Sequence, residues 1–178
     1  MLIYFYKFPP NELNINSNYE GRRQMVRMET LSQEEQQMLM RLPSPSFDTN
    51  PWVSAPALEK ARLAIITTAG LHTRNDRPFQ IDPDDFYRVI PGDAQANDLV
   101  MSHLAASFDR SGYQRDWNVV FPLDRLREMV AEGIIGSLAA FHYSVSAVHT
   151  PEEFDAPARE IARFLKKDNV NAALLIPV

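Results

Sequence analysis

Apolar, β-branched runs alternate with amphipathic helical segments along the second half of this 178-residue chain. The run Ala61–Gly70 ends in glycine and has the composition of a strand buried on both faces. Strand-like runs recur at 117–121 and 141–148, each followed by a helical segment, and the last apolar run is 171–178. This alternation predicts an α/β fold: a three-layer, open and mostly parallel sheet of the Rossmann-like or flavodoxin-like kind.

End signals predict where the helices lie. Pro122 and Gly133 bound a helix with an apolar stripe, and Thr150-Pro151-Glu152-Glu153 supplies a capping box and a first-turn proline for a helix that reaches about Lys167. A shorter helix is predicted over 32–42, and a short strand over 86–90.

Residues 1–27 differ from the rest of the chain, because they are rich in asparagine and show no hydrophobic periodicity. We expect them to be a disordered extension, or a mis-started one added by an upstream start site; the alternative is an added strand or partner-binding arm. Residues 28–178 are expected to form a single domain, which their length allows.

Composition argues against several classes of protein. The chain has 18 Lys and Arg against 23 Asp and Glu, a net charge of −5 without a basic run, so we expect no nucleic-acid partner. Because Lys7, Pro9 and Pro10 interrupt the apolar amino terminus, we expect neither a signal peptide nor a membrane partner, and we expect a cytoplasmic protein. The absence of cysteine excludes a disulfide, Cys-ligated zinc or a thiolate nucleophile within these residues.

Polar loops follow the predicted strands, and such loops carry the ligand-binding groups of open α/β sheets. His72, His103 and Asp109 are the candidate catalytic residues, and His142 is a candidate substrate contact. Histidines and carboxylates can also hold a metal, but their spacing here is not diagnostic, so no metal is predicted and a metal-dependent hydrolase is the lesser alternative. A structural role for each histidine is the competing interpretation.

Arginines follow the first predicted strand as well. Arg77 and Arg88, with Arg74 nearby, could each bind a substrate carboxylate through two parallel hydrogen bonds. The alternative is that they form ion pairs with neighbouring acidic residues, namely Asp76, Asp82, Asp84 and Asp85.

Six segments in order resemble one family, and the resemblance covers about residues 47–178. They are Ile65–His72, Tyr87–Asp93, Met101–His103, Asp116–Leu126, Ile135–Leu138 and Ala173–Val178. Together they resemble the selenoprotein B family of glycine, sarcosine and betaine reductases, and more closely the short selenoprotein subunit of D-proline reductase.

The resemblance implies an oxidoreductase that reductively cleaves a C–N bond of a small amino acid or amine. It implies a partner reductase subunit whose pyruvoyl group activates the amine, and a selenocysteine, or a cysteine in its place, directly after the strand similar to Ala173–Val178. In that setting His72, His103 and Asp109 would form the pocket wall, and Arg77 or Arg88 would contact the substrate carboxylate.

The chain departs from that pattern, because its 178 residues contain neither cysteine nor selenocysteine and no cofactor is expected in them. We expect a truncation just before the nucleophile, through a selenocysteine codon read as a stop or through a shortened gene, which leaves the sheet incomplete at its carboxyl terminus. The alternative is a non-catalytic binding or scaffold domain that retains the fold. Partial exposure of the face around 174–176 would favour a homo-oligomer.

Overall fold

A computed structural model describes residues 29, 31–41, 54, 56–104, 108–146 and 148–178. The chain divides into two units, and the helix α1 (Gln33–Met40) belongs to a separate unit from Pro51–Val178. Helix α1 confirms the helix predicted at 32–42. The extension predicted at 1–27 lies outside the described residues.

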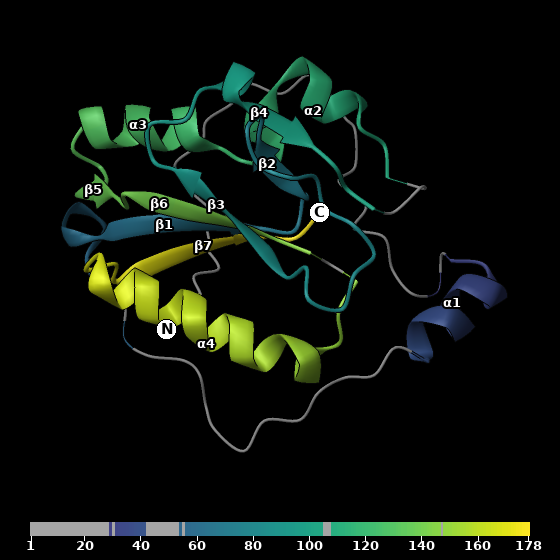
Figure 1. The fold of residues 1–178 in the computed structure, drawn as a ribbon. Helices are drawn as coiled ribbons and strands as arrows, with labels where there is room; N and C mark the ends of the chain where they lie inside the picture. Colours follow the sequence, from purple (N-terminus) through teal and green to yellow (C-terminus); the bar gives the residue numbers. More distant parts are fainter. Residues whose placement is uncertain (1–28, 30, 42–53, 55, 105–107, 147) are drawn as a thin grey trace. The chain divides into compact units, whose positions relative to one another are not determined.

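The larger unit is built on a mixed sheet (Figure 1). Strand β1 (Arg62–Thr67) lies in its middle, with β7 (Ala172–Ile176) parallel on one side and β5 (Ser137–Leu138) and β6 (Phe141–Val145) parallel on the other. Strand β3 (Tyr87–Pro91) pairs with β6 in the antiparallel direction. The predicted α/β class and the mostly parallel sheet are therefore confirmed.

The two faces of the sheet bury different side chains. Leu63 and Ile65 of β1 join a core with α3 (Leu123–Ala131), whereas Ala64 joins a second core with α4 (Pro151–Lys167). Successive strand residues point to opposite faces, so β1 contributes to both cores. Figure 1 shows α3 and α4 on opposite faces of the sheet, which gives the three layers.

The two longer predicted helices, α3 and α4, begin and end close to the residues that signal their ends. Thr150 accepts a hydrogen bond from the Glu153 main chain, and the Glu153 side chain accepts one from Thr150 N, which completes the capping box of α4. Helix α3 ends before Gly133, whose φ of 74° is the left-handed conformation that glycine adopts without strain.

Two local predictions fail. The segment predicted as a strand at 117–121 contains instead a 3-10 helix, η4 (Trp117–Val119), because the Asp116 side chain accepts a hydrogen bond from Asn118 N and turns the chain. A polar loop is predicted to follow the strand that ends at Gly70, but the chain there begins with β2 (Leu71–Thr73), which pairs with β4 (Leu99–Met101) in a separate antiparallel ribbon.

The remaining described elements are short. They are η2 (Leu58–Lys60), η3 (Ala96–Asp98) and α2 (Ser111–Arg115). Within the described part of the chain, no helix is both long and apolar enough to cross a membrane.

Candidate functional site

Three parallel strands end side by side at one edge of the sheet. Thr67 of β1 lies opposite Ser144 of β6 and Ile176 of β7, so all three strands finish at the same level. In open α/β sheets, ligands bind just outside the carboxyl ends of the strands. A ligand-binding site is therefore expected at this edge.

A pocket of about 170 Å³, here called the carboxyl-edge pocket, opens at this position. Its walls are mostly apolar, and they include Phe79 and Val145. Four side chains bring hydroxyl or imidazole groups to it, and these are Thr68, Ser102, His103 and Ser146. A pocket of this size suits a small molecule, because sites for drug-sized ligands are usually several times larger.

Two of these polar groups are already occupied by the main chain. Ser102 Oγ accepts a hydrogen bond from Phe79 N at 2.8 Å and donates to Gly70 O at 3.3 Å. Thr68 Oγ1 accepts from Val178 N at 2.8 Å and donates to Val178 O at 3.3 Å. These bonds fix the pocket wall and hold the main chain of Val178 beside it.

The other two polar groups have no hydrogen-bond partner among the described residues. Ser146 Oγ is buried and makes no hydrogen bond with another described residue. The His103 side chain is 9% exposed, and its ring nitrogens make no hydrogen bond within the described part of the chain; its ring packs 4.6 Å from that of Phe108. A buried unpaired hydroxyl costs about 1–3 kcal/mol, which a ligand that bonds to it would recover.

Gly70 explains how His103 reaches the pocket. It has a φ of 66°, and a Cβ at this position would lie 2.9 Å from His103 Cα. Ser102 N also donates to Gly70 O at 2.9 Å. Only glycine allows the loop after β1 to take this conformation and the 102–103 main chain to pack so closely against it.

His72, a predicted catalytic residue, lies on β2 and does not line this pocket. Its Nδ1 lies 2.8 Å from Thr73 O, and its Nε2 is buried without a partner among the described residues. The ring is nearly inaccessible, so the structure brings His72 and His103 to different surroundings.

His142, the predicted substrate contact, is fully buried within the sheet. Ile65 N donates to its Nδ1 at 3.1 Å, so the ring acts as an acceptor at the break between β5 and β6. Burial, assisted by the nearby positive charge of Arg127, lowers the pKa of His142 to about 4. The ring is therefore neutral at pH 7 and lies outside the carboxyl-edge pocket.

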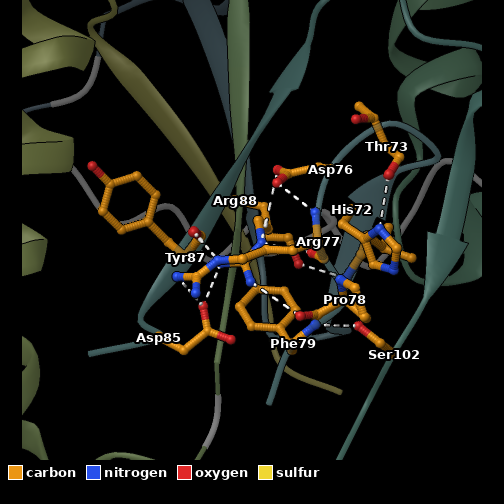
Figure 2. A network of polar contacts seen from close by, with 12 residues as sticks. His72, Thr73, Asp76, Arg77, Pro78, Phe79, Asp85, Tyr87, Arg88 and Ser102 are labelled. Atoms are coloured by element: carbon orange, nitrogen blue, oxygen red, sulfur yellow. Dashed lines mark hydrogen bonds and ion pairs between the residues drawn. The ribbon is translucent and has the colours of Figure 1, made fainter. Parts of the chain in front are cut away.

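Arg88, the first of the two predicted carboxylate contacts, is surrounded by protein acceptors (Figure 2). It lies 2.5 Å from Asp85 and donates to the carbonyl oxygens of Arg77, Pro78 and Tyr87, while its guanidinium packs 4.4 Å above the Phe79 ring. These contacts fasten the loop between β2 and β3, and they occupy the donors that a substrate would need.

Arg77, the second predicted contact, lies 3.2 Å from Asp85, and its side chain is largely exposed. Burial would raise the pKa of Asp85, but hydrogen bonds from Arg88 and Gln80 N and the charges of both arginines lower it overall. For these two arginines the structure therefore shows the ion-pair alternative, although Arg88 forms its pair in the interior and not at the surface.

Asp109, the third predicted catalytic residue, is exposed in the turn before α2. Its carboxylate accepts hydrogen bonds from Ser111 N at 2.8 Å and Ser111 Oγ at 2.9 Å, and these bonds lower the pKa of Asp109. Within the described residues no three histidines and carboxylates come together as metal ligands, so the metal-hydrolase alternative gains no support.

The sequence reasoning missed Thr68 and Ser146. Both lie immediately after a strand, where an apolar run gives way to a small hydroxyl residue at the carboxyl edge. That position was the available signal, but small hydroxyl residues are too common near strand ends to stand out without the structure.

Comparisons with known proteins agree on one family. A family model described as glycine/sarcosine/betaine reductase selenoprotein B matches residues 11–177. The D-proline reductase subunit gamma of Acetoanaerobium sticklandii is 35% identical over 132 residues, which cover 71% of this chain and 54% of the relative. The betaine reductase complex component B subunit beta of Peptoclostridium acidaminophilum is 32% identical over 155 residues, covering 83% and 35%.

A further relative, the glycine reductase complex component B subunit gamma of Symbiobacterium thermophilum, is 34% identical over 143 residues, covering 75% of this chain and 32% of the relative. The chain thus spans between about a third and about half of the length of these relatives. No solved structure matches the chain significantly.

Proposed function

This chain belongs to the glycine/sarcosine/betaine reductase selenoprotein B family, and we propose that it forms the substrate-facing wall of a reductase subunit. The reaction is reductive cleavage of a C–N bond in a small amino acid or amine, with a partner reductase subunit taking part. The names of the relatives support this substrate class, because they refer to D-proline, betaine and glycine reductases, and several call the relative a component of a complex.

The observation that carries the proposal is the pair of unpaired polar groups in the carboxyl-edge pocket. Ser146 Oγ and the His103 ring are nearly buried, and neither makes a side-chain hydrogen bond with another described residue. Their apolar surroundings exclude water and strengthen any hydrogen bond to a ligand. Hydrogen bonds from a bound amino acid would remove the cost of leaving these groups unpaired.

The nucleophile is proposed to come from outside these 178 residues, because none of them is a cysteine or selenocysteine. The family resemblance implies a position directly after the strand similar to β7. Thr68 lines the pocket and holds both main-chain groups of Val178. A selenol or thiol joined to that position would therefore start within a few ångströms of the pocket wall.

In the proposed reaction the selenolate attacks the carbon that carries the activated amine. The C–Se bond forms as the C–N bond breaks, the electron pair of the broken bond leaves with nitrogen, and the amine takes up a proton. A pyruvoyl group on the partner subunit would supply the activation. Two thiols would later be oxidised to a disulfide as the C–Se bond is replaced by a C–H bond and the selenol is regenerated. Within this chain, His103 is placed to hold the transferred proton and Ser146 to orient the substrate.

A non-catalytic binding domain is the second candidate, and the absence of cysteine favours it. Such a domain would keep the pocket and bind the amino acid without turning it over. The two candidates differ in whether a selenol or thiol nucleophile from outside these 178 residues reaches the pocket.

The test has two parts. Isothermal titration of the purified chain with glycine, sarcosine, betaine and D-proline should give saturable binding of at least one of them. The affinity for that compound should fall about tenfold in His103→Gln, because this variant loses the imidazole. Sequencing the coding DNA past Val178 should find an in-frame TGA or cysteine codon followed by further coding sequence. Binding without such a codon supports the scaffold candidate, and no binding of any of the four contradicts both.

A further inference from the structure

A second cleft, separate from the carboxyl-edge pocket, is lined by η3, β4, α2 and η4 and has a volume of about 560 Å³. Three arginines line it, and they are Arg74, Arg110 and Arg115. The proposed reaction uses none of them. The chain as a whole carries a net charge of −5, so the three positive charges in this cleft are opposite in sign to the net charge of the protein.

None of the three cleft arginines has a carboxylate partner among the described residues. Six other arginines in the described part of the chain form ion pairs, and these are Arg62, Arg77, Arg88, Arg125, Arg127 and Arg159. The ion pairs leave those guanidinium groups neutralised, whereas the positive charge of the cleft arginines is not balanced by direct pairing.

Hydrogen bonds to neutral acceptors orient two of the three cleft arginines. Arg74 Nε donates to Asn97 O, and Arg110 donates to His103 O at 2.7 Å. Both acceptors are main-chain carbonyls, so these bonds orient the guanidinium groups and leave other N–H donors available. The Arg115 side chain makes no hydrogen bond or ion pair with another described residue, and it is exposed to the cleft.

Two carboxylates also line the cleft, but they do not cancel this charge. Asp124 lies 3.1 Å from Arg127 and accepts hydrogen bonds from Trp117 Nε1 and Asn118 Nδ2. Asp116 accepts from Asn118 N and Nδ2, both at 2.9 Å. Of the lining residues, Asp116 alone is left to oppose three guanidinium groups, which leaves the cleft positive.

Neutral donors complete the lining. Tyr113 donates from its hydroxyl to Leu99 O at 3.4 Å. Burial raises the pKa of Tyr113, and the positive charge of Arg74 opposes that rise. Like charges gathered in one cleft repel, and an anion placed between them removes that repulsion and gains attraction to each. Guanidinium groups are also the donors best matched to carboxylate and phosphate oxygens.

We propose that this cleft binds an oxyanion, the carboxylate or the phosphate group of a small molecule, through Arg74, Arg110 and Arg115. Its volume lies within the usual range of small-molecule sites, roughly 300–1,000 Å³. Arg110 joins the two sites, because the carbonyl that it holds belongs to His103 of the carboxyl-edge pocket. The inference is independent of the proposed reaction, since it concerns different residues and a different ligand group.

The test is isothermal titration of the purified 178-residue chain with inorganic phosphate and with acetate, each at constant ionic strength set by sodium chloride. Saturable binding of at least one anion is expected. Arg115→Gln and Arg74→Gln should each raise its Kd about tenfold or more, because each removes a charge-assisted hydrogen bond. Arg125→Gln is the matched control, since this exposed arginine pairs with Glu128 on α3 and lies outside the cleft.

The outcomes separate the sources of the oxyanion. Binding of phosphate but not acetate assigns a phosphate group, and the reverse assigns a carboxylate. If neither anion shows saturable binding, the proposal is overturned. It is also overturned if Arg125→Gln loses as much affinity for the anion as the cleft variants do. Ser146→Ala keeps the two sites apart, because Ser146 lines the carboxyl-edge pocket and not the cleft, so this variant should leave the Kd of phosphate and of acetate unchanged.

Discussion

Two regions of the larger unit bury polar side chains, but one pairs them with protein groups and the other leaves them unpaired within the described residues. The Arg88 cluster, made of Asp76, Arg77, Asp85 and Arg88, pairs a buried guanidinium with a buried carboxylate and with main-chain carbonyls. The carboxyl-edge pocket leaves Ser146 Oγ and the ring of His103 unpaired within the described residues. Charged residues that resemble ligand-binding groups therefore hold a loop together, while a serine hydroxyl and an imidazole ring stay unpaired within the described residues and can bind a ligand.

The sharpest test of this contrast replaces Arg88 by methionine. Arg88→Met leaves the Asp85 carboxylate buried without its main partner, and we expect a loss of about 3–5 kcal/mol in the free energy of unfolding, measured by urea denaturation at pH 7. Arg77→Met is the control, since that side chain is 62% exposed and its pair should contribute no more than about 1 kcal/mol. Equal losses in the two variants would show that Arg88 does not fasten the loop.

His142 offers a second test, because it is buried and neutral within the sheet. Its folded pKa of about 4 lies below the unfolded value of about 6.5, so between these pH values the unfolded chain binds a proton that the folded chain does not. Stability should therefore fall as the pH drops from 6.5 to 4, by up to about 3 kcal/mol.

The variant His142→Gln should flatten this pH dependence, because the amide oxygen can accept from Ile65 N and does not titrate. Urea denaturation of both proteins between pH 4.5 and 7 measures the two slopes. If the variant keeps the slope of the parent protein, other groups cause the pH dependence.

A substitution at Gly70 tests whether the loop after β1 packs closely against the main chain of residues 102–103. Gly70→Ala should lower stability by about 2 kcal/mol, because the left-handed backbone strains alanine and its Cβ would lie 2.9 Å from His103 Cα. Gly112→Ala is the matched control in α2, where a Cβ meets Val119 at an ordinary 3.6 Å and alanine favours the helix. Thermal melts of both variants give the comparison, and a tolerated Gly70→Ala would mean that the close approach can relax.

Much of the fold follows from local signals in the sequence. The buried run at β1, the capping box at Thr150 and the glycine after α3 each act within a few residues, and the structure has these elements where the signals predict them. The segment at 117–121 looks like a strand in composition. Hydrogen bonds from Asn118 to Asp116 and from Trp117 to Asp124 turn it into a 3-10 helix instead.

The site was harder to predict because pairing between distant residues decides which polar groups stay free. His103 was a candidate from its loop position, and it lines the carboxyl-edge pocket. Arg88 was an equally good candidate by residue type, but its guanidinium pairs with Asp85 and donates hydrogen bonds to three main-chain carbonyl oxygens. Ser144 and Ser146 differ by two positions in the chain, but only Ser144 meets a main-chain donor, Leu71 N at 2.7 Å.

These two serines allow the most direct measurement, which records stability and ligand binding for Ser144→Ala and Ser146→Ala. Ser144→Ala leaves Leu71 N unpaired, so we expect it to lose about 1 kcal/mol or more and to bind the strongest of glycine, sarcosine, betaine and D-proline like the parent protein. Ser146→Ala removes a buried unpaired hydroxyl, so it should be at least as stable as the parent protein and should bind that amino acid about tenfold more weakly. Loss of stability in Ser146→Ala with unchanged binding would contradict the assignment of the carboxyl-edge pocket as the ligand site.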